Sequence, residues 1–126
     1  MKNVLTVTAL IEVGAGLLLV AFPSPAATLL VGSSLDTPAG FTIVRIAGAA
    51  LVAIGVICWL ARHDGQSRAA RRLVGTLLFY NAAILTVLVY AAFGLELSSN
   101  GLWPSALVHA AMTVWCMKSF LASRHP

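Results

Sequence analysis

The sequence predicts an all-α fold, a transmembrane four-helix bundle with a short interfacial helix after the first span. Hydrophobic residues make up 60% of the 126 residues and charged residues only 10%, well below the quarter or so that is usual in soluble domains. Four apolar runs each approach the roughly 20 residues that cross about 30 Å of hydrocarbon, at residues 4–22, 39–61, 73–93 and 102–121. No run alternates with period two, which excludes strands. Residues 1–126 are therefore expected to form one four-span transmembrane domain.

The connection after the first span has the composition of a short helix. In "PSPAATLLVG", Ser24 is a suitable N-cap, Pro25 suits the first helical position and Gly32 suits the end. We expect this helix to lie at the outer surface, or to dip back into it, and to tie the first two spans together.

The basic residues predict the orientation, because lysine and arginine collect in cytoplasmic loops. All of them except Arg45 lie before the first run, between the second and third, or at the end of the fourth: Lys2, Arg62, Arg68, Arg71, Arg72, Lys118 and Arg124. The other two connections carry only Asp36 and Glu96. We therefore expect a multi-pass protein of the bacterial inner (plasma) membrane with both termini cytoplasmic. Since topology accounts for the net charge of +4, the lipid bilayer is the expected partner and nucleic acid is not.

Each apolar run contains one strongly polar side chain at mid-membrane depth. At about 1.5 Å per residue, Glu12 and Asn81 lie about 12 Å from the inner boundary, and Arg45 and His109 about 10 Å from the outer one. An isolated charge at the membrane centre costs about 3 kcal/mol on insertion scales. Glu12 and Arg45 are therefore expected to face the bundle interior and to pair, with Asn81 and His109 completing the hydrogen bonds.

Small residues accompany both charges on their helix faces. Gly16 follows Glu12 by four positions, and Gly48 follows Arg45 by three. Small residues at such positions let two membrane helices approach closely. The first two spans are therefore expected to pack against each other along these faces.

Two interpretations of the polar residues remain open. A buried ion pair with its hydrogen bonds can simply fix which helices associate, but an ionisable residue within a span is also a functional-site hypothesis. We predict a membrane protein that binds or translocates a small ion or polar ligand at Glu12, Arg45, Asn81 and His109, as a homo-oligomer or beside a larger membrane-protein partner. The alternative is an accessory, structural subunit of a larger membrane complex, such as a respiratory one.

Metal and enzyme chemistry have weaker support. His109, Met112 and Cys116 share one helix face and would suit Cu(I), but methionine and cysteine are ordinary packing residues, so neither a metal nor another cofactor is expected. HExxH, GxSxG and P-loop motifs are absent, and no catalytic residue is assigned. Acid–base chemistry by Glu12 and His109 on a lipid or quinone is a minor alternative.

Several segments carry a family resemblance. "IEVGAGLLLVAFPS", "VRIAGAALVAIGVICWLAR", "LFYN" and "LWPSALVHA" resemble small four-span bacterial inner-membrane proteins that lack an assigned function. The resemblance covers most of the chain and implies a four-helix membrane protein without implying an activity. The chain is also similar, to a lesser degree, to DoxX-type proteins, some of which accompany respiratory oxidases, although no motif here transfers that role.

Overall fold

The computed structural model describes residues 1–64 and 67–122, and these residues form helices and connections without any strand. The helices are α1 (Lys2–Ala21), α2 (Pro23–Val31), α3 (Pro38–Ala61), α4 (Arg68–Phe93) and α5 (Leu102–Ala122). The four long helices cover the four predicted spans, and α2 is the predicted short helix. The predicted fold class is therefore confirmed. Arg124, expected at the cytoplasmic end of the fourth span, lies outside the described residues.

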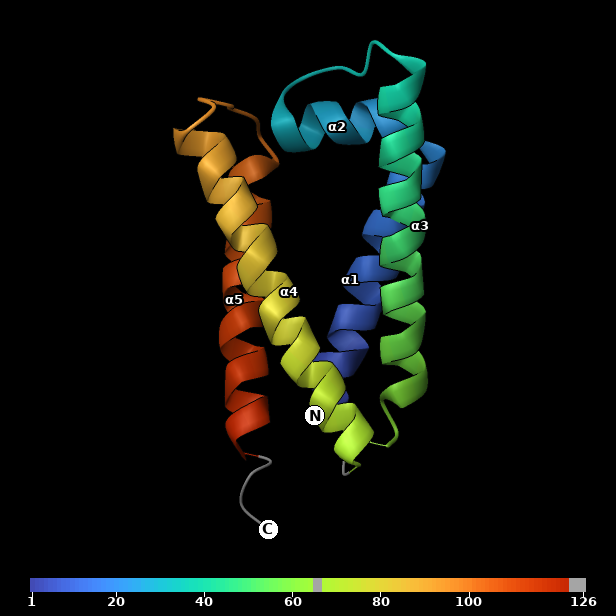
Figure 1. The fold of residues 1–126 in the computed structure, drawn as a ribbon, viewed down its shortest axis with the longest axis vertical. Helices are drawn as coiled ribbons and strands as arrows, with labels where there is room; N and C mark the ends of the chain where they lie inside the picture. The colour runs from blue at the N-terminus through green and yellow to red at the C-terminus, as the bar shows by residue number, and fades with distance from the viewer. Residues whose placement is uncertain (65–66, 123–126) are drawn as a thin grey trace.

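Helix α2 begins earlier than the sequence suggested. Phe22 leaves the helical conformation with φ −130° and ψ 60°, and Pro23 directly opens the next helix. Ser24 is therefore inside α2 and does not cap it. Gly32 ends the helix as predicted, in the left-handed conformation with φ 75°, which a residue without a side chain adopts readily. Figure 1 shows α2 lying across the upper end of the bundle.

Side chains cap the two longest helices at their N-termini. The Thr37 hydroxyl accepts a hydrogen bond from the Gly40 backbone N–H at 3.1 Å, and Ser67 does the same for Ala70 at 3.0 Å. Each contact satisfies one of the backbone donors that the first turn of a helix leaves free. Residues just outside the apolar runs therefore set where α3 and α4 begin.

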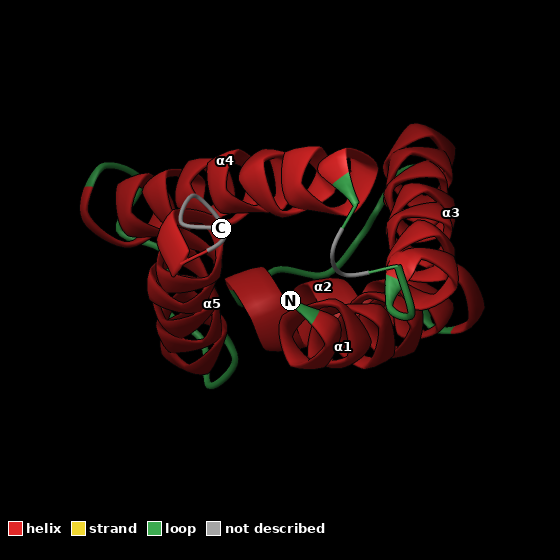
Figure 2. Cartoon of the chain, turned by 90° about the horizontal axis from the view of Figure 1, so that it is seen from below, coloured by secondary structure: helices red, strands yellow, loops and turns green. Residues whose placement is uncertain are grey.

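The long helices are arranged as two pairs, α1 with α3 and α4 with α5, as Figures 1 and 2 show. The first pair is close enough that a side chain on Gly48 would meet backbone: a Cβ there would lie 2.7 Å from the Gly16 carbonyl oxygen. A Cβ on Gly55 would similarly lie 2.9 Å from the Ala9 carbonyl oxygen. The predicted close approach of the first two spans is confirmed.

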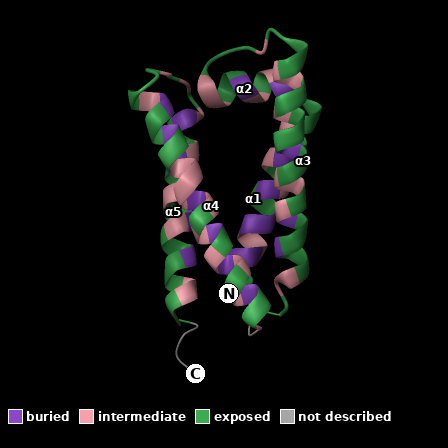
Figure 3. Cartoon of the chain, viewed as in Figure 1, coloured by how far each residue is buried: buried purple, intermediate pink, exposed green. Residues whose placement is uncertain are grey.

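The two pairs share an apolar core at the lower end of the bundle, where the N-terminal parts of α1 and α4 lie (Figure 3). Buried apolar residues from all four long helices form one core there: Val4, Leu5, Ala9, Cys58, Ala70, Val74, Leu77, Met112 and Cys116. At the upper end, α2 connects the pairs through the α4–α5 loop. The Gly101 N–H donates to the Leu29 carbonyl at 3.0 Å, and the Ser99 hydroxyl donates to Leu30 at 2.7 Å.

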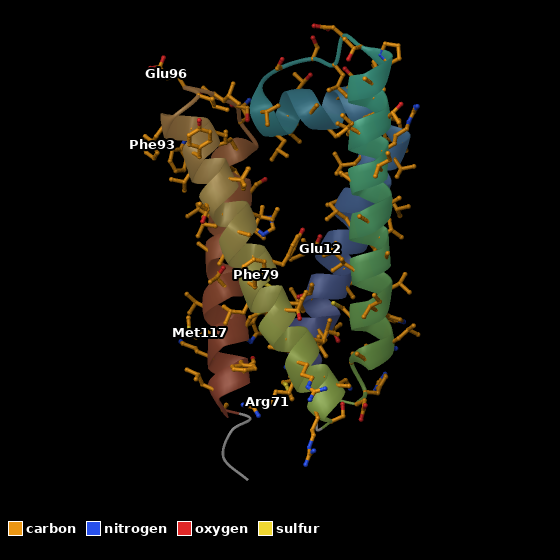
Figure 4. The ribbon with its side chains drawn as sticks, viewed as in Figure 1. Glu12, Arg71, Phe79, Phe93, Glu96 and Met117 are labelled. Carbon is orange, nitrogen blue, oxygen red and sulfur yellow. The ribbon has the colours of Figure 1, made fainter. Side chains whose placement is uncertain are left out.

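All four long helices have the length and hydropathy of membrane spans. Their most apolar windows have mean hydropathies of 2.2, 2.3, 1.9 and 1.2 in chain order. Arg71 lies near one end of the molecule and Glu96 at the other (Figure 4). This separation is part of the charge asymmetry on which the predicted orientation depends.

Candidate functional site

Glu12 is buried at the middle of α1 and contacts the other helix pair. Its side chain is only 4% exposed, and its Oε2 atom accepts a hydrogen bond from the Tyr80 hydroxyl of α4 at 3.1 Å. Figure 4 shows Glu12 on the side of α1 that faces α4. Tyr80 is not among the site residues predicted from the sequence. The available signal was a hydroxyl within an apolar span, directly before Asn81.

Asn81 and His109 join α4 to α5. Asn81 is 2% exposed; its Nδ2 atom donates to the Leu77 carbonyl at 2.8 Å, and its Oδ1 atom lies 2.9 Å from His109 Nδ1. Because a backbone carbonyl can only accept, the amide atom that faces Leu77 must be the nitrogen, and the amide atom that faces His109 must be the oxygen. Asn81 Oδ1 is then an acceptor, and His109 Nδ1 must carry the proton.

The two contacts lie side by side. The Tyr80 and His109 rings meet edge to face, with centroids 6.0 Å apart and planes at 78°, a favourable arrangement for two aromatic groups. Glu12, Tyr80, Asn81 and His109 therefore form one polar cluster that reaches from α1 through α4 to α5. Three of the four residues predicted to form the site belong to this polar cluster.

Arg45 is the exception, and its predicted pairing with Glu12 is wrong. Arg45 is exposed, and its Nε atom donates to the Val20 carbonyl at 3.3 Å. Val20 belongs to the last turn of α1, where the final carbonyls lack partners within the helix and a cation is favoured. The guanidinium therefore extends along the α1–α3 seam toward the end of the bundle, away from the level of Glu12.

A cavity of about 600 Å³ lies beside the polar cluster, between the two helix pairs and beneath α2. Polar side chains reach it from three helices: Glu12, Tyr80, Ser105 and His109. The remaining lining is apolar and comes from α1, α2, α3 and α4: Ile11, Ala15, Leu18, Leu19, Phe22, Pro25, Ala26, Leu29, Leu30, Ala47, Leu51, Ile84 and Leu88. We call this cavity the chamber. Its walls are apolar, polar side chains lie on one side, and it is partly open, since Leu18, Phe22 and Leu29 of its lining are also exposed.

The weak copper candidates separate in the structure. Met112 and Cys116 are buried in the apolar core, whereas His109 turns to Asn81 in the polar cluster. Cys58 and Cys116 are both free and buried. Within residues 1–64 and 67–122, no three side chains of histidine, cysteine, aspartate or glutamate gather as a metal site would require.

Neither a protein-family model, nor a curated protein sequence, nor a solved structure matches this chain. The class of protein is therefore defined by the fold alone. Four apolar helices of membrane-spanning length around a shared core are those of a small integral, multi-pass membrane protein.

Proposed function

We propose that this protein binds a small amphipathic ligand within the membrane, in the cavity between its two helix pairs. The observation that carries the proposal is a chamber of about 600 Å³ with apolar walls and the polar cluster on one side. Ligand sites in proteins have volumes of about 300–1,000 Å³ and combine mostly apolar walls with a few polar groups that orient the ligand. The ligand's polar group would contact Glu12, Tyr80 and His109, and its apolar body would fill the chamber.

The alternative that the polar cluster only fixes helix packing explains less of this arrangement. A packing network is most stable when every buried polar group has its partners. Here Glu12 and His109 both line the cavity. Oε1 of Glu12 and Nε2 of His109 have no hydrogen-bond partner in the described part of the chain. A bound polar group would supply those partners.

The proposal narrows the ligand predicted from the sequence. A small ion has no need of thirteen apolar residues around it, whereas a molecule with an apolar body does. Translocation, the other half of the predicted function, would require the helix pairs α1–α3 and α4–α5 to rock about the site. Association into an oligomer, or with a larger partner, remains a separate expectation.

Filling the cavity tests the proposal. Ala15 lines the chamber one turn above Glu12, so Ala15→Phe places a ring inside it. Ala53→Phe is the matched control, because Ala53 is exposed on α3 and does not line the chamber. The full chain would be purified in lipid nanodiscs, and native mass spectrometry would record small molecules that stay bound.

The expected result is a bound small molecule on the wild type and on Ala53→Phe, and at least about a tenfold lower occupancy on Ala15→Phe, since overlap with the ring removes more than 1.4 kcal/mol of binding. Equal occupancy on all three would show that the cavity is not the site. A stoichiometric larger protein partner, with no bound small molecule, would favour the accessory subunit instead.

A further inference from the structure

We infer that the ligand presents a cationic hydrogen-bond donor, such as a protonated amine, to the polar cluster. This inference rests on the proposed function and adds the chemical class of the ligand. Two features indicate this class: the atoms of the polar cluster that are still free to form a hydrogen bond, and the charges around the cavity.

His109 offers the cavity an acceptor. Its Nδ1 atom carries a proton, because that atom faces Asn81 Oδ1 and the Asn81 amide is fixed by its bond to the Leu77 carbonyl. In a neutral imidazole, the other ring nitrogen is then unprotonated and can only accept. The ligand group that meets Nε2 must therefore be a donor.

Glu12 and Tyr80, like His109, offer hydrogen-bond acceptors to the ligand. The single Tyr80 hydroxyl proton is used in the bond to Glu12 Oε2, so Tyr80 has only lone pairs left to offer. Opposite a cationic group Glu12 would be ionised, and its Oε1 atom, which has no partner within the described residues, would then only accept. Ser105, one turn above His109, also lines the cavity, and its hydroxyl can either donate or accept.

The charges around the cavity favour a cation. Among the residues that the structure describes, no lysine or arginine lines the cavity, and Arg45 of α3 donates to the Val20 carbonyl instead. An anion in this apolar chamber would meet no compensating charge and would lie beside Glu12, which is strongly unfavourable. A protonated amine would neutralise Glu12, donate to the free acceptors and contact the electron-rich face of the Tyr80 ring.

Three matched probes test the inference: 4-phenylbutylamine, 4-phenylbutanol and 5-phenylpentanoate, which share a phenyl ring with four methylenes. Near neutral pH the first is cationic, the second neutral and the third anionic. Their binding to the full chain in nanodiscs would be measured by isothermal titration calorimetry, with empty nanodiscs subtracted. The amine should bind at least about tenfold more tightly than the alcohol, and the carboxylate should bind least.

Two glutamate variants locate the effect. Glu12→Gln should remove the preference for the amine over the alcohol, whereas Glu96→Gln should keep it, because Glu96 lies in the outer loop beyond α4. The wild-type ranking decides the inference even if Glu12→Gln does not fold. If the alcohol or the carboxylate binds as well as the amine, the cationic class is wrong and the proposed function stands. If none of the probes binds, both proposals fail.

Discussion

Helices α1 and α3 touch backbone to backbone, whereas α4 and α5 are joined by side chains that meet between them. A Cβ on Gly16 would lie 2.5 Å from the Gly48 carbonyl oxygen, and one on Gly48 would lie 2.9 Å from the Leu19 Cβ. In the second pair, Asn81 hydrogen-bonds His109, and the Phe93 and Trp103 rings meet at 5.7 Å. One pair thus depends on the absence of side chains and the other on their presence.

This difference between the two pairs follows from the lipid that surrounds membrane helices. Lipid tails are as apolar as leucine, so membrane helices gain little from apolar burial and associate through close packing or interhelical hydrogen bonds. The α1–α3 pair relies on close packing, with the exposed Arg45–Val20 hydrogen bond at its edge, and the α4–α5 pair relies on the Asn81–His109 hydrogen bond. Because its backbones are in direct contact, the glycine-packed pair has little room to adjust, and it holds Glu12 in a fixed place.

Between the pairs, contact is concentrated at the lower end. There the apolar core joins all four long helices, while higher up the cavity separates them and α2 covers the end. The Tyr80–Glu12 hydrogen bond lies at the boundary between the apolar core and the cavity. The structure thus places its polar cluster at the floor of a chamber, and not in the middle of a closed core.

The largest effect is expected from a side chain placed in the glycine contact. Gly48→Leu forces α1 and α3 apart, because even its Cβ would lie 2.7 Å from the Gly16 carbonyl oxygen. Overpacking of this kind should cost about 3 kcal/mol, read as a lower thermal unfolding midpoint by circular dichroism in detergent.

Gly14→Leu is the control for that prediction, since a Cβ at Gly14 meets nothing within 4 Å. Each variant replaces one glycine with leucine inside a helix, so the difference in helix propensity cancels between them. Equal midpoints for the two variants would contradict glycine packing of this pair.

An intermediate effect is expected in the α4–α5 pair. Asn81→Leu removes the amide and leaves the His109 Nδ1–H without its acceptor, which should cost about 1 kcal/mol in a membrane protein. His109→Leu leaves Asn81 unpaired in the same way. The double variant should then lose less than the sum, with a coupling of about 0.6–1.7 kcal/mol in a double-mutant cycle.

Thr86→Val serves as the control for this cycle, because the Thr86 hydroxyl bonds only within its own helix, to Ala82. It should be additive with either change. Strict additivity of Asn81→Leu and His109→Leu would mean that the hydrogen bond does not hold the pair together.

The smallest effect is expected from Arg45, at the exposed edge of the α1–α3 pair. Arg45→Gln removes one exposed hydrogen bond to Val20, and substitutions at exposed sites usually stay within about 0.5 kcal/mol. Combined with Glu12→Gln, its effect on the unfolding midpoint should be additive, because the two side chains have no contact in the described structure. A double variant more stable than either single variant would indicate that Glu12 and Arg45 form an ion pair in the wild type, and would overturn this description.

Several elements of the fold could be predicted from the sequence. The spans, the short helix ended by Gly32 and the close approach of the first two spans at Gly16 and Gly48 are all read correctly. Each depends on short-range features: the length of an apolar run, a residue that tolerates positive φ, or a missing side chain. The start of α2 was missed because two prolines compete for the first helical position and only the fold selects Pro23.

The site itself was decided by tertiary structure. The sequence gives the depth of Glu12, Arg45, Asn81 and His109, because depth follows from the helical rise per residue. It does not give the rotation and tilt of each helix, which neighbouring helices determine. Only that packing turns Tyr80 toward Glu12, directs Arg45 to the free carbonyl of Val20 and leaves a chamber beside the polar cluster.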